Sequence, residues 1–336
     1  MTSTIESLCD IQVPVYQAGM GGVGGPKLAA AVSNAGGLGH LGCIRRGAAQ
    51  IRDWIRQTRD LTDRPFGVNL VPKGPGPDGF EAQLSAVLEE RPKVLSLFWG
   101  DFGTVIPRAK AAGIVTMAQI GSVAEAERAA AAGADAIIAQ GFEAGGHVGG
   151  TVGLMALLPA VLRAVAPLPV LAAGGIADRD GVAAALHLGA AGAWVGTRFV
   201  ATAESLAHDI YKRRLVAAGA DDTVHGHGYS YGWPLGSAYR VIPPRRRSPY
   251  RFIAGGARRG DRDAYAEGLS LYAGQGVGLI DDVPPAARVL ADLAGIDPGT
   301  DRYPDALVVG GGDVQAQGDQ RGSGQPLHRP ANPRSA

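Results

Sequence analysis

The stretch QGFEAGGHVGG, residues 140–150, places one histidine, His147, between two pairs of glycines, with Glu143 four residues before it. A neutral imidazole with an ordinary pKa of about 6.5 can accept a proton near neutral pH. The flanking glycines leave the main chain bare, which lets a ligand approach it closely. The stretch therefore indicates a ligand that binds beside a single titratable group, with a solvated loop histidine as the alternative.

Other histidines and cations give weaker signals. His40 lies near the end of an apolar run and could face the same site. His225 and His227 have no neighbouring carboxylate, so we expect no metal site there or elsewhere in the chain. The basic run 245–247 predicts a solvated face that could attract an anionic substrate.

The elements that must position these residues begin with eight short apolar runs in the first 200 residues. Each run is too short for an ordinary helix and predicts a strand buried on both faces, as in a parallel sheet. The runs are residues 13–19, 36–42, 66–70, 94–100, 114–121, 134–141, 169–175 and 191–197.

Helical patterns separate these runs. Residues 25–37 begin with Pro26 near the first helical position and end at a glycine. Ser122 and Glu125 have the spacing of a capping box, and residues 178–190 repeat the arrangement. Eight strand–helix units predict an α/β fold, a closed (β/α)8 TIM barrel, with an open doubly wound sheet as the alternative.

The alternation ends after Thr197. We expect residues 1–199 and 266–297 to form the barrel, and residues 200–265 to form an inserted, mostly helical lid or substrate subdomain over its mouth. Residues 305–336 are rich in Gly, Gln, Pro and Arg, and we expect them to be disordered.

Composition limits the classes of function. The chain has 336 residues, of which 46% are hydrophobic, so it can bury a large core. Its formal net charge of +1 argues against a nucleic-acid partner. Cys9 and Cys43 form no CxxC pair that would suggest zinc or a disulfide framework. With neither a signal-peptide pattern nor a membrane-length apolar run, we expect a cytoplasmic protein without a membrane partner.

Two strand ends suggest a phosphate site. Active sites of (β/α)8 barrels form at the carboxyl ends of the strands, and phosphates commonly bind after the seventh and eighth. Gly174 and Gly175 follow the seventh predicted strand, and Gly196 and Thr197 follow the eighth. Bare amides and one hydroxyl at those positions favour an anion over glycines that only turn the chain.

A second glycine pattern gives an alternative. GMGGVG, residues 19–24, matches the dinucleotide-binding pattern G-x-G-x-x-G. That motif expects an acidic residue about 20 positions later, and this region has none. Only an NADP-type site that uses Arg45 or Arg46 would remain, so the match is weak.

Together these motifs resemble the nitronate monooxygenase family, formerly called 2-nitropropane dioxygenases, which are FMN-dependent (β/α)8 barrels. The resemblance covers roughly residues 10–295 and is specific at family level. The matching stretches are PVYQAGMGGVGGPKLAAAVSNAGGLGHLG, FGVNL, AQGFEAGGHVG, PVLAAGGIAD, GAWVGTRF, YGWP and LYAGQGVGLIDD.

The resemblance implies FMN as cofactor and His147 as the catalytic base. The implied FMN contacts are Gly19, Met20, Gly21, Asn69, Gly145 and Gly146 along the flavin, Gln119 and Gln140 at its ring or ribityl edge, and Gly174, Gly175, Gly196 and Thr197 at its phosphate. Position 119 is often lysine in similar proteins. Glutamine there offers a hydrogen bond without the charge that would stabilise a reduced, anionic flavin.

The implied reaction is oxidative denitrification of a small alkyl nitronate, such as propionate 3-nitronate, with dioxygen. One alternative keeps FMN but takes electrons from NAD(P)H, because EAGGH is also similar to flavin-type enoyl-ACP reductases and quinone reductases. Others are a non-redox barrel enzyme that binds a sugar phosphate, and a flavin-binding protein without turnover. The residues leave the substrate undetermined, and a homodimer is the candidate assembly.

Overall fold

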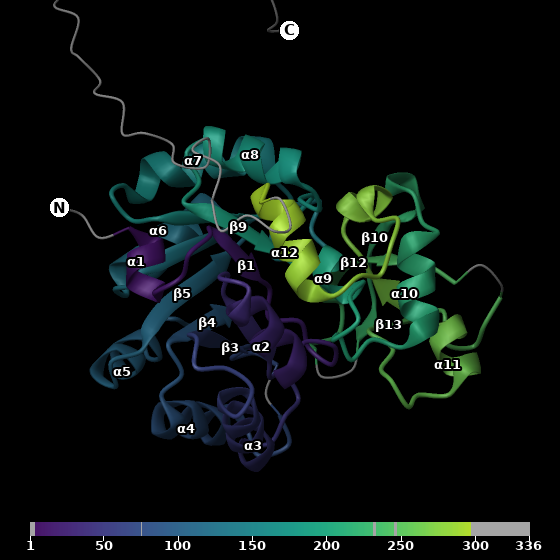
Figure 1. Cartoon of the computed structure of the whole chain (residues 1–336), viewed down its shortest axis with the longest axis horizontal. Coiled ribbons are helices and arrows are strands. Elements are labelled where there is room, and N and C mark those ends of the chain that lie inside the picture. The colour runs from purple at the N-terminus through teal and green to yellow at the C-terminus, as the bar shows by residue number, and fades with distance from the viewer. Residues whose placement is uncertain (1–3, 75, 231–232, 245–246, 297–336) are drawn as a thin grey trace, which may run out of the picture.

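The computed structural model describes residues 4–74, 76–230, 233–244 and 247–296 (Figure 1). The tail that we expect to be disordered, residues 305–336, lies outside these ranges. Figure 1 shows a larger body, in which β1, β3, β4, β5 and β9 are labelled, and a smaller one beside it, in which β10, β12 and β13 are labelled.

The larger body is an eight-stranded parallel barrel, and all eight predicted strands are confirmed. Its strands are β1 (Val15–Gln17), β2 (Gly39–Gly42), β3 (Phe66–Leu70), β4 (Val94–Phe98), β5 (Val115–Ile120), β6 (Ala136–Gln140), β8 (Val170–Ala173) and β9 (Gly192–Val195). Their spatial order is β1-β9-β8-β6-β5-β4-β3-β2, and a parallel bridge between Tyr16 and Leu38 joins the two ends. Closure removes the open doubly wound sheet, and with it the dinucleotide-binding alternative, from consideration.

Helices surround the barrel in the order that the sequence predicts. They are α2 (Pro26–Asn34), α3 (Ala48–Arg59), α4 (Phe80–Glu90), α5 (Ile106–Ala111), α6 (Val123–Ala131), α7 (Leu154–Val165) and α8 (Arg179–His187), with α1 (Ile5–Cys9) before β1. The eighth position is taken by α12 (Ala286–Ala294), because only the four-residue α9 (Thr197–Val200) follows β9 directly. Leu290 and Leu293 of α12 pack with Leu28 of α2 and Val182 of α8.

Local capping explains where two of these helices begin. The Ser122 hydroxyl accepts a hydrogen bond from the Glu125 amide at 3.3 Å, and the Asp178 carboxylate accepts one from the Gly181 amide at 2.8 Å. Both are N-cap contacts that satisfy an otherwise unpaired helical N–H. The Glu125 carboxylate accepts from the Gly121 amide rather than from Ser122, so the box is shifted by one residue.

The segment after β9 is a mixed unit, which corrects the expectation of a mostly helical insertion. It contains α10 (Asp209–Val216), η1 (Ala220–Asp222), α11 (Asp263–Gly268) and η2 (Gln275–Leu279), and also the strands β10 (Val224–His227), β11 (Tyr229–Ser230), β12 (Ala238–Ile242), β13 (Ile253–Gly255) and β14 (Ser270–Tyr272). These strands form a second sheet, in which β14 lies between β12 and β13 although it falls within the predicted barrel segment 266–297. They are short and partly polar, so hydrophobic periodicity does not reveal them.

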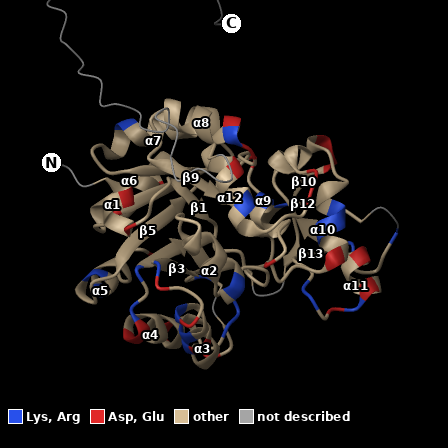
Figure 2. Cartoon of the chain, in the orientation of Figure 1, with Lys and Arg blue, Asp and Glu red and all other residues tan. Residues whose placement is uncertain are grey.

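The two bodies are joined at β7 (Gly146–His147), a two-residue strand that pairs antiparallel with β12. Charged residues lie mainly on the outer helices and on loops near α10 and α11 (Figure 2). In the described part of the chain, every helix is too short or too polar to cross a bilayer.

Candidate active site

A cavity lies at the carboxyl ends of the barrel strands, where the second sheet covers them. Its empty volume is about 1150 Å³, including its open mouth. The structure brings all thirteen predicted site residues to its wall. They are Gly19, Met20, Gly21, Asn69, Gln119, Gln140, Gly145, Gly146, His147, Gly174, Gly175, Gly196 and Thr197.

His147 is held at the junction of the barrel and the second sheet. Its main chain lies opposite Tyr239 of β12, and the residue is only 5% exposed. The imidazole stacks on the Trp233 ring, with centroids 3.6 Å apart and planes 13° from parallel. Its Nε2 atom is buried and has no hydrogen-bond partner among the described residues. A buried polar atom without a partner is costly, so this nitrogen is suited to a ligand in the cavity.

The environment of His147 lowers its pKa to about 3. Burial is the main cause because it disfavours the charged imidazolium, and the positive charge of Arg45 adds to the effect. This corrects the expectation of an ordinary pKa near 6.5. The imidazole is therefore neutral at physiological pH, but it is a weak base.

Gln140 positions the loop that carries His147. Its amide nitrogen donates to the His147 carbonyl oxygen at 2.9 Å, and its carbonyl oxygen accepts from the Gly149 amide at 3.1 Å. Glu143 has a similar supporting role, because its carboxylate accepts from the Leu154 amide at 3.0 Å at the start of α7. Both carboxylate oxygens of Glu143 therefore bind main chain rather than His147.

Two other amide side chains have polar atoms that can hydrogen-bond a ligand. The Asn69 nitrogen donates to the Ser96 hydroxyl at 3.0 Å, and no hydrogen bond is made by its carbonyl oxygen among the described residues. Within the same described ranges, the Gln119 side chain has no hydrogen-bond partner. Both residues line the cavity, so they can each offer polar atoms to a bound molecule.

Another part of the cavity wall consists of glycine backbone without side chains. Gly174 has φ +106°, and a Cβ there would lie 3.1 Å from the Ala144 nitrogen. A Cβ on Gly145 would lie 2.3 Å from the Gly274 nitrogen, so these loops touch one another without intervening side chains. The Thr197 hydroxyl accepts from the Gly274 amide at 3.0 Å and keeps its own hydrogen for another acceptor.

Several wall residues were not predicted as part of this site. Trp233, Tyr272, Tyr211 and Arg45 all line the cavity. Trp233 lies in YGWP and Tyr272 in LYAGQGVG, two stretches that carry the family resemblance, so the resemblance was the available signal.

The other histidines lie outside the cavity. His40 is completely buried inside the barrel, where its ring packs against Trp194 with centroids 4.5 Å apart, and burial lowers its pKa to about 3. His225 packs on Phe142, and its ring centroid lies 5.4 Å from that of His227. Within the described ranges, no three His, Cys, Asp or Glu side chains cluster as metal ligands.

Comparison with protein families gives a match over most of the folded chain. The family model described as nitronate monooxygenase matches residues 2–79 and 73–230. A nitronate monooxygenase of Pseudomonas aeruginosa is 37% identical in an alignment of 351 positions, gaps included. This alignment covers 87% of this chain and 98% of that protein.

A second relative has a different activity. The (3aS,4S,5R,7aS)-5-hydroxy-7a-methyl-1-oxo-octahydro-1H-indene-4-carboxyl-CoA dehydrogenase of Rhodococcus jostii is 42% identical over 225 residues. The alignment covers 66% of this chain and 62% of the dehydrogenase, so it spans less than two thirds of that relative's length.

Two solved structures share the fold. FabK from Thermotoga maritima has a TM-score of 0.75 at 34% identity, covering 87% of this chain and 95% of its own. A nitroalkane oxidase from Streptomyces ansochromogenes has a TM-score of 0.73 at 34% identity, covering 85% of this chain and 95% of its own. Alignments of this length extend beyond the barrel into the segment that forms the second sheet.

Proposed function

This chain belongs to the nitronate monooxygenase family, a family of enzymes, and on that premise we propose that it uses FMN and dioxygen to denitrify alkyl nitronates. The observation that carries the proposal is the cavity, which is lined both by a buried imidazole with an unpaired Nε2 and by bare backbone at the ends of the barrel strands. A small-molecule substrate fits such an enclosed site.

The residues present fit a flavin phosphate. Gly174, Gly175 and Gly196 offer main chain at the ends of β8 and β9. The amide of Thr197 begins α9 and lacks an intrahelical acceptor, and its hydroxyl hydrogen is available. When bound, FMN would supply the redox centre that protein side chains lack.

The other end of the cavity suits a planar ring and a small substrate. Asn69 and Gln119 would hydrogen-bond the ring edge, while Gln140 keeps the loop of His147 in place. Trp233 covers the imidazole and limits the entry of water. We infer that His147 holds the substrate as a neutral hydrogen-bonding partner, and that its weak basicity favours a substrate that arrives already as the nitronate anion.

The test begins with the purified protein incubated with FMN, FAD or riboflavin and freed of unbound flavin. We expect retention of FMN, seen by visible absorption, and weaker retention of riboflavin, which lacks the phosphate. The FMN-loaded protein should then consume oxygen and release nitrite when propane-2-nitronate is added. Failure to retain any flavin, or absence of nitrite from several nitronates, would reject the proposal.

The second candidate is an FMN-dependent reductase or dehydrogenase that exchanges electrons with NAD(P)H. It is favoured by the 42% identity to a CoA-thioester dehydrogenase. This activity would appear as oxidation of NADH or NADPH by the loaded protein without nitrite release. A homodimer and a cytoplasmic location remain predictions.

A further inference from the structure

Two arginines from distant parts of the chain meet beside the cavity. Arg45 follows β2, whereas Arg258 lies on the loop between β13 and α11. Both side chains surround the turn at Gly22, where φ is +87°. Arg258 Cδ and Arg45 Nη2 lie 3.5 Å and 3.8 Å from the position that a Cβ on Gly22 would occupy. The two cationic side chains therefore share one small space.

The contacts of the surrounding loops fix this arrangement. The Arg259 amide donates to the Leu206 carbonyl at 2.7 Å, and Ala207 forms a bridge with Arg258. A Cβ on Gly256 would lie 3.4 Å from Val23, so this loop packs on the turn after β1. The meeting of the arginines thus follows from main-chain contacts of the second body with the barrel.

Arg45 lies between the exposed Arg258 and the buried His147 in degree of burial. Arg45 lines the cavity and is half-buried, whereas Arg258 is exposed and His147 is buried. The backbone of Arg45 has φ +64°, an uncommon conformation for a residue other than glycine. Such conformations persist where the surrounding structure holds them, often at ligand sites.

Charge in this region is predominantly positive. Arg46 is adjacent, and its guanidinium lies 3.9 Å from the centroid of the Trp54 ring. The nearby carboxylates bind main chain: Asp78 accepts from the Ala48 amide at 2.8 Å and Asp261 from the Arg258 amide at 2.6 Å. In the described ranges, Arg46 and Arg258 have no ion-pair partner. Neighbouring guanidinium groups repel one another, and an anion between them would relieve this repulsion.

We propose that Arg45 and Arg258 bind a second anionic group of the substrate, a carboxylate or a phosphate at the end remote from the reacting carbon. The reacting carbon would lie deeper, beside His147. The inference rests on the proposed function for what happens at that carbon, but anion binding itself can be measured without turnover. A carboxylate would come from a short acidic nitronate, and a phosphate from a longer carrier such as CoA.

Binding of inert probes to the FMN-loaded protein tests the site directly. Succinate supplies carboxylates and free CoA supplies phosphates, and calorimetric titration gives the dissociation constant for each. We expect at least one probe to bind, with an affinity that falls at least tenfold in Arg45→Gln and in Arg258→Gln and that weakens with added salt. Tighter binding of succinate would indicate a carboxylate, and tighter binding of CoA a phosphate.

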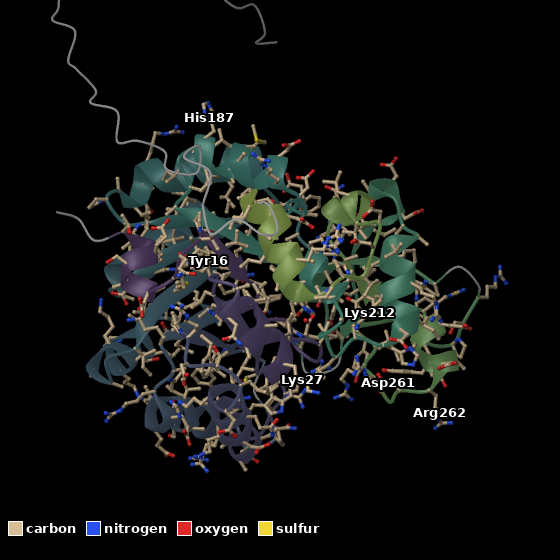
Figure 3. All side chains as sticks on the ribbon, viewed as in Figure 1. Tyr16, Lys27, His187, Lys212, Asp261 and Arg262 are labelled. Carbon is tan, nitrogen blue, oxygen red and sulfur yellow. The ribbon has the colours of Figure 1, made fainter. Side chains whose placement is uncertain are left out.

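Arg262→Gln is the matched control, because Arg262 is exposed on the same loop and lies at the outer edge of the molecule near Asp261 (Figure 3). It should bind the probes within twofold of the wild type. Circular dichroism checks that Arg45→Gln is folded, and exposed Arg258 gives an independent variant. The inference is overturned if neither probe binds the wild type, or if both arginine variants bind as the wild type does.

Turnover separates this inference from the proposed function. With propionate 3-nitronate, Arg258→Gln should raise KM about tenfold and leave kcat nearly unchanged. With propane-2-nitronate, which lacks the carboxylate, KM should change less than twofold. A protein that oxidises no nitronate but still shows arginine-dependent probe binding would reject the proposed function and retain the anion site.

Discussion

At the ends of β8 and β9 the barrel offers bare backbone to the cavity, whereas the second sheet and its loops add aromatic side chains. Gly174, Gly175 and Gly196 come from the ends of barrel strands. Trp233 and Tyr272 come from the second body, and both rings contact His147, with centroids 3.6 Å and 5.4 Å away. Backbone amides suit a phosphate that is the same in every turnover, while side chains can differ with the substrate. We therefore propose that the barrel binds the cofactor and that the second body determines which substrate binds.

The largest expected effect is at the junction of the two bodies. His147→Asn should lower kcat/KM for nitronates about 100-fold, because among the described residues that line the cavity it removes the only imidazole, which we propose positions the substrate. Bound FMN, measured by absorption, should be unchanged. His187→Asn is the control, since His187 is exposed on α8 at the outer edge of the molecule (Figure 3) and does not line the cavity. Full activity of His147→Asn would remove His147 from the catalytic account.

The barrel side of the comparison is tested at Gly174. Gly174 has φ +106°, a conformation that alanine rarely adopts, and the added Cβ of Gly174→Ala would lie 3.1 Å from the Ala144 nitrogen. The backbone of the cavity wall must therefore shift. We expect the affinity for FMN, measured by equilibrium dialysis, to fall about 30-fold. Gly133→Ala is a matched control, because Gly133 has φ +86° but nothing within 4 Å of the added Cβ. Equal flavin affinities for these two variants would separate Gly174 from cofactor binding.

The second body is tested at Trp233. Trp233→Ala removes the ring stacked on His147, so KM for nitronates should rise about tenfold while FMN affinity stays within twofold. Trp99→Ala should have a smaller effect, because the Trp99 ring is tilted and 6.1 Å from that of His147. If Trp233→Ala released FMN and left KM intact, the division of roles between the two bodies would be wrong.

A further prediction concerns stability at acidic pH. Burial lowers the pKa of His40 and His147 to about 3, whereas the unfolded chain protonates histidine near 6.5. The unfolded state therefore binds more protons between these values, and stability falls as pH decreases through this window. Each histidine should contribute up to about 1.4 kcal/mol per pH unit to the slope.

Urea denaturation of the flavin-free protein between pH 7 and pH 4 measures this slope. His147→Asn should reduce it by the share of one histidine and leave the share of His40. A slope that is identical in His147→Asn and the wild type would show that His147 is not buried as described.

The sequence predicted the barrel because its strands follow local patterns, whereas most residues of the cavity wall were predicted from the family resemblance. Apolar runs located every barrel strand, and residues such as Gly174 and Thr197 followed from the strand ends. The second sheet escaped prediction because its strands are short and pair with segments far away, as β12 does with β7. The pKa of His147 could not be predicted either, because it depends on residues that lie far from His147 in the sequence. Trp233 covers the ring from 86 residues away, and Arg45 acts on it from 102 residues away.

The most direct test of the central claim is anaerobic mixing of the FMN-loaded protein with propane-2-nitronate, followed by absorbance near the visible flavin band. The account predicts that the nitronate bleaches the flavin within the turnover time and that readmitted dioxygen restores its colour. A flavin that stays oxidised with nitronates and is bleached only by NADH or NADPH would contradict it.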